Sequence, residues 1–272
     1  MSEPASLRET LSLERIEVNL FRGQAPSEQG PRIFGGLVIG QALMAAYGTV
    51  EGRLCHSLHC YFIRPGDPAI PIVYEVDRSR DGRSFTTRRV TAIQHGAQIF
   101  NFAASFQEEE GGFEHQDPMP PRPALASLPS EIDAWGAGRP IEMRWTQPRD
   151  WDAAPVAGPA AQSVWMRAIA PIGEDVALQQ AALAYASDMS LMSTGMRPHA
   201  ITWRTPGFQS ASLDHAIWFH RQSNFNAWHL YDQTSPSASG GRGLNFGQIF
   251  REDGALVATT AQEGLMRLRQ PL

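Results

Sequence analysis

Two stretches of the chain are apolar on nearly every side of a helix. Residues 35–46 (GGLVIGQALMAA) contain no charge, and residues 181–192 (AALAYASDMSLM) contain only one. A helix without a polar face has to be covered all round by the rest of the protein. We therefore expect one buried helix in each half of the chain.

Each expected helix is followed by alternating apolar and polar segments rich in β-branched and aromatic side chains, which is typical of strands. The expected strands are residues 58–63, 72–76, 85–93 and 98–106, then 213–219, 227–231, 243–250 and 256–261. The sequences DGR (81–83) and EDG (252–254) indicate hairpin turns. The pattern predicts an α+β fold in which each buried helix is wrapped by a long antiparallel sheet. Two such hot-dog repeats in tandem make a double hot dog.

The two halves are also alike in sequence. YFIR (61–64) matches WFHR (218–221) at an offset of 157 residues, Gly96 matches Gly254 at 158, and Arg83 matches Arg242 at 159. Unrelated segments seldom keep one offset, so we interpret the chain as two copies of one fold. EEEGG (108–112) and five prolines between residues 118 and 129 separate the copies and disfavour regular structure. We place the first repeat at 1–112, a Pro-rich linker at 113–140 and the second repeat at 141–272.

Composition narrows the class of protein. The net charge is −5 and no block of basic residues occurs, which argues against nucleic acid or an anionic membrane surface as partner. No apolar run reaches the roughly 18 residues of a membrane span. MSEPASLRET does not look like a secretory signal, and RLRQPL is not a peroxisomal address, so we expect a cytoplasmic protein.

The two cysteines, Cys55 and Cys60, are five residues apart on one expected strand. This odd spacing predicts opposite faces, hence two reduced thiols rather than a disulfide. Two lone cysteines also give no zinc pattern, and no HExxH or GxSxG motif occurs. We expect neither a metal nor a cofactor.

Six stretches, in order along both halves, together resemble the acyl-CoA thioesterase II family: FGGLVIGQAL (34–43), YFIRPG (61–66), DGRSFTTRRV (81–90), YASD (185–188), SLDHAIWFHR (212–221) and AQEG (261–264). The resemblance implies hydrolysis of fatty acyl-CoA to free fatty acid and CoA, without a metal or a covalent intermediate. It assigns the activation of water to Asp188, Ser212 and Gln262. Ser212 stands where we expect threonine in the family, and it keeps the hydroxyl.

The residues alone leave other interpretations open for these three positions. Asp188 falls in an apolar helical stripe with Ala184 and Met192, where a carboxylate is costly, so it could instead face outward or cap a break in the helix. Ser212 could be an ordinary residue at a strand edge, and Gln262 could be an exposed strand end. At the same offsets the first copy has Cys55 for Ser212 and Ala104 for Gln262, and a shorter gap brings Gln41 near the position of Asp188. We therefore expect one active site per chain, in the second copy.

Other candidate residues stay open. Six arginines could hold the phosphates of CoA: Arg64, Arg83, Arg88, Arg89, Arg221 and Arg242. Four tryptophans near the linker could line an acyl tunnel or seal an interface: Trp135, Trp145, Trp151 and Trp165. SGGRG (239–243) favours a turn over a phosphate cradle, and the adjacent Asp214 and His215 point to opposite faces of a strand.

Two other functions compete with hydrolysis. One is a hot-dog hydratase or dehydratase acting on enoyl- or hydroxyacyl-CoA, and the other is a non-catalytic acyl-CoA-binding protein. The first would need an Asp/His pair in a hydratase-type motif, which we do not find, and the complete trio argues against the second. The sequence does not fix the acyl chain length, the substrate-binding residues or the oligomeric state, although a homo-oligomer is expected from the resemblance.

Overall fold

The structure is a computed structural model that describes residues 6–26, 31–129, 140–147 and 153–269. Its first half consists of α1 (Leu7–Leu11), β1 (Glu14–Glu17), β2 (Leu20–Gly23), α2 (Gly35–Tyr47), β3 (Leu54–Phe62), β4 (Ile72–Asp81), β5 (Phe85–Gln94) and β6 (Ala97–Gln107). Its second half consists of β7 (Ile141–Trp145), β8 (Ala161–Ala168), α3 (Val176–Ser187), α4 (Ser193–Met196), β9 (Phe208–Ser212), β10 (Asp214–Phe219), β11 (His229–Ser239), β12 (Arg242–Arg251) and β13 (Leu256–Leu268). Short 3₁₀ turns lie at Leu125–Ser127 and Arg197–His199.

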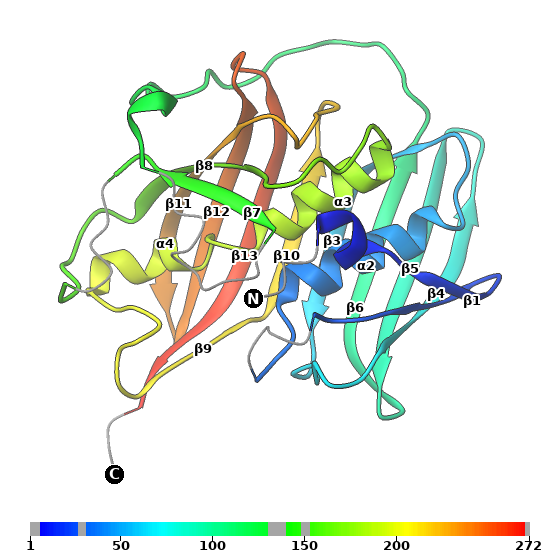
Figure 1. Cartoon of the computed structure of the whole chain (residues 1–272), viewed down its shortest axis with the longest axis horizontal. Helices are drawn as coiled ribbons and strands as arrows, with labels where there is room; N and C mark the ends of the chain where they lie inside the picture. The colour runs from blue at the N-terminus through cyan, green and yellow to red at the C-terminus, as the bar shows by residue number, and fades with distance from the viewer. Residues whose placement is uncertain (1–5, 27–30, 130–139, 148–152, 270–272) are drawn as a thin grey trace.

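All the strands form one antiparallel sheet that curves around two helices. The sheet order is β1-β2-β4-β5-β6-β3-β10-β13-β12-β11-β8-β7, with β9 added to β13. Equivalent strands of the two halves follow in mirrored order outward from the central β3–β10 pair. Helices α2 and α3 contact each other and lie side by side against the sheet (Figure 1). The expected α+β double hot dog is confirmed.

The strand registers show which residues of the two halves are equivalent. Tyr74 pairs with Ala92 in the first half, and Tyr231 pairs with Ile249 in the second, each partner lying 157 residues further on. In the same way the β5–β6 and β12–β13 registers give an offset of 158 for β6 and β13. The offsets predicted for the YFIR and Gly96 segments therefore agree with the pairing. Arg83 and Arg242 were wrongly matched, because β12 begins with Arg242 where β5 begins with Phe85.

The two helices cross where both have a small residue. A Cβ on Gly40 of α2 would lie 2.6 Å from Leu11 Cδ2 and 3.1 Å from the main-chain oxygen of Ala181 on α3. Gly40 and Ala181 are 141 residues apart, as are the first residues of the two helices, Gly35 and Val176. This offset therefore relates α2 to α3. Most of the buried apolar side chains of both halves form one continuous core around this crossing.

The second helix was predicted with the wrong bounds, although residues 181–187 are helical. Residues 181–192 were expected to be helical, but α3 covers Val176–Ser187. Beyond its end, the main-chain oxygen of Ser190 accepts a hydrogen bond from Gln162 Nε2 at 3.0 Å, and its Oγ accepts one from Gln233 Nε2 at 2.6 Å. These two bonds from the sheet hold the main chain and the side chain of Ser190 in the turn that follows α3, where a continued helix was predicted. In β11, a register shift between Thr234 and Ser237 accommodates the intervening proline, so this strand runs well past the predicted residue 231.

Cys55 and Cys60 do not lie on opposite faces. Both are 2% exposed, and both belong to the main core with free thiols. The β3–β6 register shifts between Cys55 and Ser57, and this bulge inserts one residue that reverses the alternation. The bulge cannot be seen in the sequence pattern, which is why the prediction was wrong.

The connection between β6 and β7 packs against the second half of the sheet. In its described part, residues 108–129, only the 3₁₀ turn at Leu125–Ser127 is regular. Its side chains Met119, Leu125 and Leu128 contact a small cluster that contains Trp165 and Trp228. Trp165 therefore seals this contact, and Trp145 is buried in the main core. Trp135 and Trp151 lie outside the described residues.

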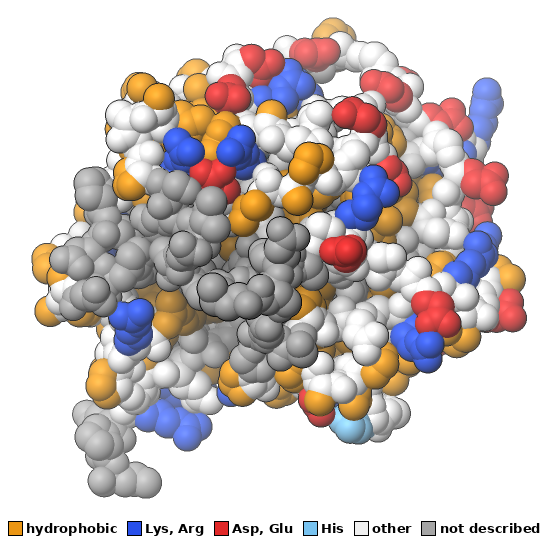
Figure 2. All heavy atoms as spheres, viewed as in Figure 1, with side chains coloured by type: hydrophobic (Ala, Val, Ile, Leu, Met, Phe, Trp, Pro, Cys, Tyr) orange, Lys and Arg blue, Asp and Glu red, His pale blue; other side chains and the backbone are white. Residues whose placement is uncertain are grey.

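The surface seen in Figure 2 mixes acidic and basic side chains, without a large area of one sign among the residues coloured by type. This distribution agrees with the absence of basic blocks in the sequence. Among the described residues, no helix has the length and apolar character that a membrane span requires.

Candidate active site

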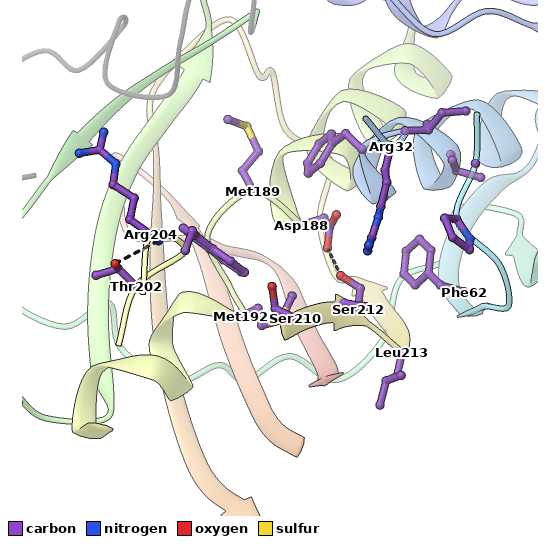
Figure 3. Close-up of a pocket in the computed structure, with 18 of the residues that line it drawn as sticks. Arg32, Phe62, Asp188, Met189, Met192, Thr202, Arg204, Ser210, Ser212 and Leu213 are labelled. Carbon is purple, nitrogen blue, oxygen red and sulfur yellow. Dashed lines mark hydrogen bonds between the residues drawn. The ribbon is translucent and has the colours of Figure 1, made fainter. Parts of the chain in front are cut away.

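Asp188 lies at the end of helix α3 rather than within it. It is the C-cap residue, with φ −83° and ψ −13°, and its side chain is half-buried. The helical stripe with Ala184 and Met192 that we expected is therefore wrong. The alternative that Asp188 caps a helix break fits its position, but the carboxylate points toward Ser212, not toward bulk solvent (Figure 3).

The structure brings the three predicted residues together. Gln262 Nε2 donates to Asp188 Oδ1 at 2.5 Å, and Ser212 Oγ lies 3.5 Å from the same oxygen. Gln262 Nε2 is also 3.2 Å from Ser212 Oγ. Two hydrogen-bonding side chains thus converge on one carboxylate oxygen.

Strand pairing explains why Ser212 and Gln262 meet. Ser212, the last residue of β9, pairs with Gly264 of β13. Gln262 lies two residues before Gly264, so its side chain is on the same face of the strand. A Cβ on Gly264 would lie 2.6 Å from Met192 Sδ, so glycine makes room for the segment that follows Asp188.

Gln262 is not an exposed strand end, as one interpretation held. Its side chain is 0% exposed, and its Oε1 has no hydrogen-bond partner among the described residues. A buried acceptor of this kind is costly unless it is satisfied, for example by a water molecule. The site therefore presents the carboxylate of Asp188 and the hydroxyl of Ser212 to the adjoining pocket, with the Gln262 amide bonded to both.

The first copy contributes the start of helix α2 to this site. An ideal Cβ on Gly35, the first residue of α2, would lie 2.7 Å from Asp188 Oδ2. The N-cap residue Phe34 makes no side-chain capping bond, and both Phe34 and Gly35 line the adjoining pocket. The positive end of the α2 dipole thus borders the carboxylate and the pocket, where it favours negative charge.

Asp188 and Ser212 open into a cavity of about 1400 Å³ between the two copies. Its apolar wall includes Phe34, Phe62 and Phe100 from the first copy and Met189 and Met192 from the second. Figure 3 shows these second-copy methionines and Phe62 around the Asp188–Ser212 pair. The cavity is larger than an ordinary small-molecule pocket, so it can take a long ligand with an apolar part.

Three arginines line the cavity: Arg32, Arg64 and Arg204. Of the six predicted arginines, only Arg64 is among them. Arg88 is instead 1% exposed, bonds to Thr49 and forms an ion pair with Asp81 at 2.6 Å, so it holds the end of α2 to the β4–β5 hairpin. Sequence reasoning missed Arg32 and Arg204 because neither lies in a segment that repeats between the halves or resembles the family.

Gln41 is not the first-copy equivalent of Asp188. The helix offset of 141 instead assigns Tyr47, whose hydroxyl accepts a hydrogen bond from Cys55 N at 2.8 Å and also bonds to Gln180. Burial, first of all, raises the pKa of Tyr47 well above its ordinary value, so the phenol stays neutral. The pairing registers keep Cys55 and Ala104 at the positions of Ser212 and Gln262. The first copy thus has a filled, uncharged cluster at the equivalent place.

The remaining sequence candidates lie outside the cavity. Residues 239–243 form the β11–β12 hairpin turn, with Gly240 and Gly241 at positive φ. Asp214 and His215 point apart: Asp214 Oδ1 accepts from Glu263 N at 2.7 Å, whereas His215 is buried. Desolvation raises the pKa of Asp214 and lowers that of His215 to about 3, so this imidazole is neutral. Within the described ranges, no group of three or more His, Cys, Asp or Glu side chains is placed to hold a metal ion.

Known proteins match this chain over almost its entire length. Residues 139–265 match the family model described as acyl-CoA thioesterase, and residues 24–107 match the acyl-CoA thioesterase N-terminal domain. Acyl-CoA thioesterase 2 of Haemophilus influenzae is 40% identical over 279 residues, covering 96% of this chain and 96% of that protein. Human acyl-coenzyme A thioesterase 8 is 38% identical over 95% of this chain and 88% of its own length.

Solved structures give the same result. The acyl-CoA thioesterase II TesB2 of Mycobacterium marinum has a TM-score of 0.84 and 44% identity, covering 97% of this chain and 99% of that one. A hot-dog protein of unknown function from Alicyclobacillus acidocaldarius has a TM-score of 0.80 at 22% identity and bears on the fold alone. With two family models covering both halves and relatives near 40% identity along the whole length, the chain belongs to the acyl-CoA thioesterase II family of thioester hydrolases.

Proposed function

We propose that the protein hydrolyses fatty acyl-CoA of medium to long chain by direct attack of a water molecule. In this proposal Asp188 activates the water, and Ser212 and Gln262 hold it. The observation that carries the proposal is the convergence of Ser212 and Gln262 on one oxygen of Asp188 beside a large, mostly apolar cavity.

The reaction needs little machinery. The Asp188 carboxylate takes one proton from water while the water oxygen bonds to the thioester carbonyl carbon. The tetrahedral intermediate then collapses, the C–S bond breaks, and the sulfur leaves with the bonding electron pair. A thiol with a pKa near about 8.5 needs only weak assistance to leave, and the proton on Asp188 can return to it or to solvent. The products are the free fatty acid and CoA, and Asp188 ends as a carboxylate.

The start of α2 is placed to stabilise the developing oxyanion. Gly35 approaches Asp188 closely enough that a thioester attacked by Asp188-bound water would have its carbonyl near the first turn of this helix. The positive end of the helix dipole favours a negative oxygen there. In this proposal the first copy is thus part of the catalytic apparatus, although it lacks the trio.

The side chains that line the cavity support separate binding of the two parts of the substrate. Its aromatic and methionine side chains suit the acyl chain, whereas Arg32, Arg64 and Arg204 suit the phosphates of CoA. We accordingly propose that repeat 1–112 supplies the helix start and part of the wall, that repeat 141–272 supplies the trio, and that the linker 113–140 joins them.

A cytoplasmic location and a homo-oligomer remain proposals from the sequence. The free, buried thiols of Cys55 and Cys60 support a reducing compartment. Burial, followed by the Asp188 and Asp214 carboxylates, raises the pKa of Cys60 well above its ordinary value, so this neighbour of the site stays uncharged.

Release of free thiol from a series of acyl-CoA substrates of increasing chain length tests the proposal. We expect thiol release with the highest kcat/KM for chains of medium to long length. A hydratase would consume enoyl-CoA without releasing thiol, and a binding protein would do neither. Either of these results, or turnover of short acyl chains alone, would contradict the proposed function.

A further inference from the structure

The duplicated fold provides an internal comparison for the surroundings of Asp188. Ser187 and His215 of the second copy are both buried, at 0% and 1% exposure. The helix and strand offsets assign them to Ala46 and Leu58 of the first copy, which are also fully buried. The copy with the trio therefore has a polar pair at the positions where the copy without it has an apolar pair.

The polar pair is hydrogen-bonded in one consistent way. Ser187 Oγ lies 2.8 Å from the main-chain oxygen of Ala184 and 2.9 Å from His215 Nε2. A hydroxyl has one proton, and the main-chain oxygen can only accept it, so Ser187 Oγ accepts a bond from His215 Nε2–H. The imidazole is thereby assigned as the Nε2–H tautomer.

Stability does not explain why a histidine lies here. The imidazole is buried, and its Nδ1 has no hydrogen-bond partner among the described residues. A buried acceptor without a partner destabilises a fold, whereas Leu58 shows that leucine fits the equivalent position. The histidine thus lowers the stability of the second copy in a way that the first copy avoids.

The contact acts on the residue next to Asp188. Ser187 ends α3, and its main-chain oxygen also accepts a bond from Tyr231 Oη at 2.9 Å. With its side chain and its main chain both bonded to the sheet, Ser187 has little freedom to move. Because Asp188 follows directly as the C-cap, the direction of its carboxylate depends on where Ser187 is held.

We propose that His215 and Ser187 form a positioning pair that fixes the Asp188 carboxylate toward the attacking water. The inference builds on the proposed function, in which Asp188 is the general base. Without the pair, the end of α3 can shift by a fraction of an ångström, and misplacement of a reacting group on this scale costs about tenfold or more in rate.

The test replaces the pair with that of the first copy. The double variant Ser187→Ala/His215→Leu leaves no polar atom of the pair unsatisfied, so the urea midpoint should be no lower than that of the wild type. We expect kcat to fall about tenfold or more with KM changed less than about twofold. His215→Gln, which can still donate toward Ser187 Oγ, should recover most of kcat.

Tyr74→Phe provides the matched control. It removes an equally buried bond, from Tyr74 Oη to Gln41 Oε1 at 2.9 Å, in the first copy. This variant should lose some stability and keep kcat. If kcat simply follows stability across all these variants, the pair is only structural and the inference is wrong.

Asp188→Asn separates this inference from the proposed function. In that background, adding Ser187→Ala/His215→Leu should cause no further loss of kcat, because the pair acts through Asp188. An inactive Asp188→Asn protein beside a fully active double variant overturns the positioning pair alone. Residual activity in Asp188→Asn close to that of the wild type overturns the proposed function itself.

Discussion

Adding one methyl group at Gly35 should damage catalysis without unfolding the protein. In Gly35→Ala the new Cβ would lie 2.7 Å from Asp188 Oδ2, and 2.9 and 3.0 Å from Cζ and Cε1 of Phe62. Contacts this short between non-bonded atoms are relieved by a shift of about half an ångström. A rigid helix start moves less easily than a half-buried side chain at a helix end, so the carboxylate should be displaced.

The size of the effect follows from this displacement. Misplacing a catalytic group by about 1 Å can cost about 100-fold, so a shift half as large should lower kcat about 10-fold or more. Alanine is favoured over glycine in a helix by about 0.5–1 kcal/mol. This gain offsets part of the cost of crowding Phe62, which is about 1–3 kcal/mol for an added methyl group. The free energy of unfolding should therefore change by less than about 2 kcal/mol.

Gly40→Ala is the matched control on the same helix. Its Cβ would press against Leu11 and the main chain of Ala181, more than one helical turn away from Asp188. We expect it to lower the free energy of unfolding by about 1–3 kcal/mol while the folded fraction keeps its kcat. Measurements of thiol release and urea unfolding for both variants test whether the loss of kcat is specific to Gly35→Ala. A Gly35→Ala enzyme with kcat within twofold of the wild type would refute the close approach of α2 to the base.

The remaining predictions concern the trio, the number of sites and the response to acid. Ser212→Ala and Gln262→Ala should each lower kcat in the thiol-release assay by about 10- to 1000-fold, less than the loss of Asp188, and Ser212→Thr should keep most activity. A threonine variant as inactive as the alanine variant would show that the hydroxyl of residue 212 is not what activity requires. Cys55→Ser should create no second site, so titration with a non-hydrolysable acyl-CoA analogue should still give one site per chain, and a value of two would be incompatible with it. The pKa of His215 is about 3 in the folded chain against 6.5 for the free group, so the unfolded state binds more protons between these values and stability falls as pH drops through this window. Between about pH 7 and pH 5, urea unfolding should show the wild type losing about 2 kcal/mol more than His215→Leu, whereas equal losses would mean that the histidine is not buried and neutral.

The fold could be predicted from pattern because its main features are local. An uncharged helix at 35–46, alternating strands and a nearly constant offset between halves were enough to indicate a duplicated helix-and-sheet unit. The predictions that were wrong concern features that depend on contacts between residues far apart in the sequence. Helix α3 ends at Ser187 because Gln162 and Gln233 bond to the segment that follows it, and both residues are remote in sequence. The β3 bulge beside Cys55 likewise has no signature in the alternation.

The candidate site was predicted mainly through the resemblance. Ser212 looks like any strand-edge serine until β9 pairs with β13 and brings it beside Gln262. The equivalence of Tyr47 with Asp188 could not be read from the sequence, because a helix offset of 141 differs from the strand offset of 157. Arg32 and the close approach of Gly35 depend on how the two copies face each other across the cavity.

The central claim is that Asp188 is the base that activates water, and Asp188→Asn tests it most directly. The substitution keeps the size of the side chain and its hydrogen bond with Ser212, but an amide cannot take the proton. Thiol release from a long-chain acyl-CoA, measured beside urea unfolding, should show kcat lower by about 10²- to 10⁴-fold, with KM and the urea midpoint near those of the wild type. A folded Asp188→Asn enzyme that retains a third or more of the wild-type kcat would contradict the account.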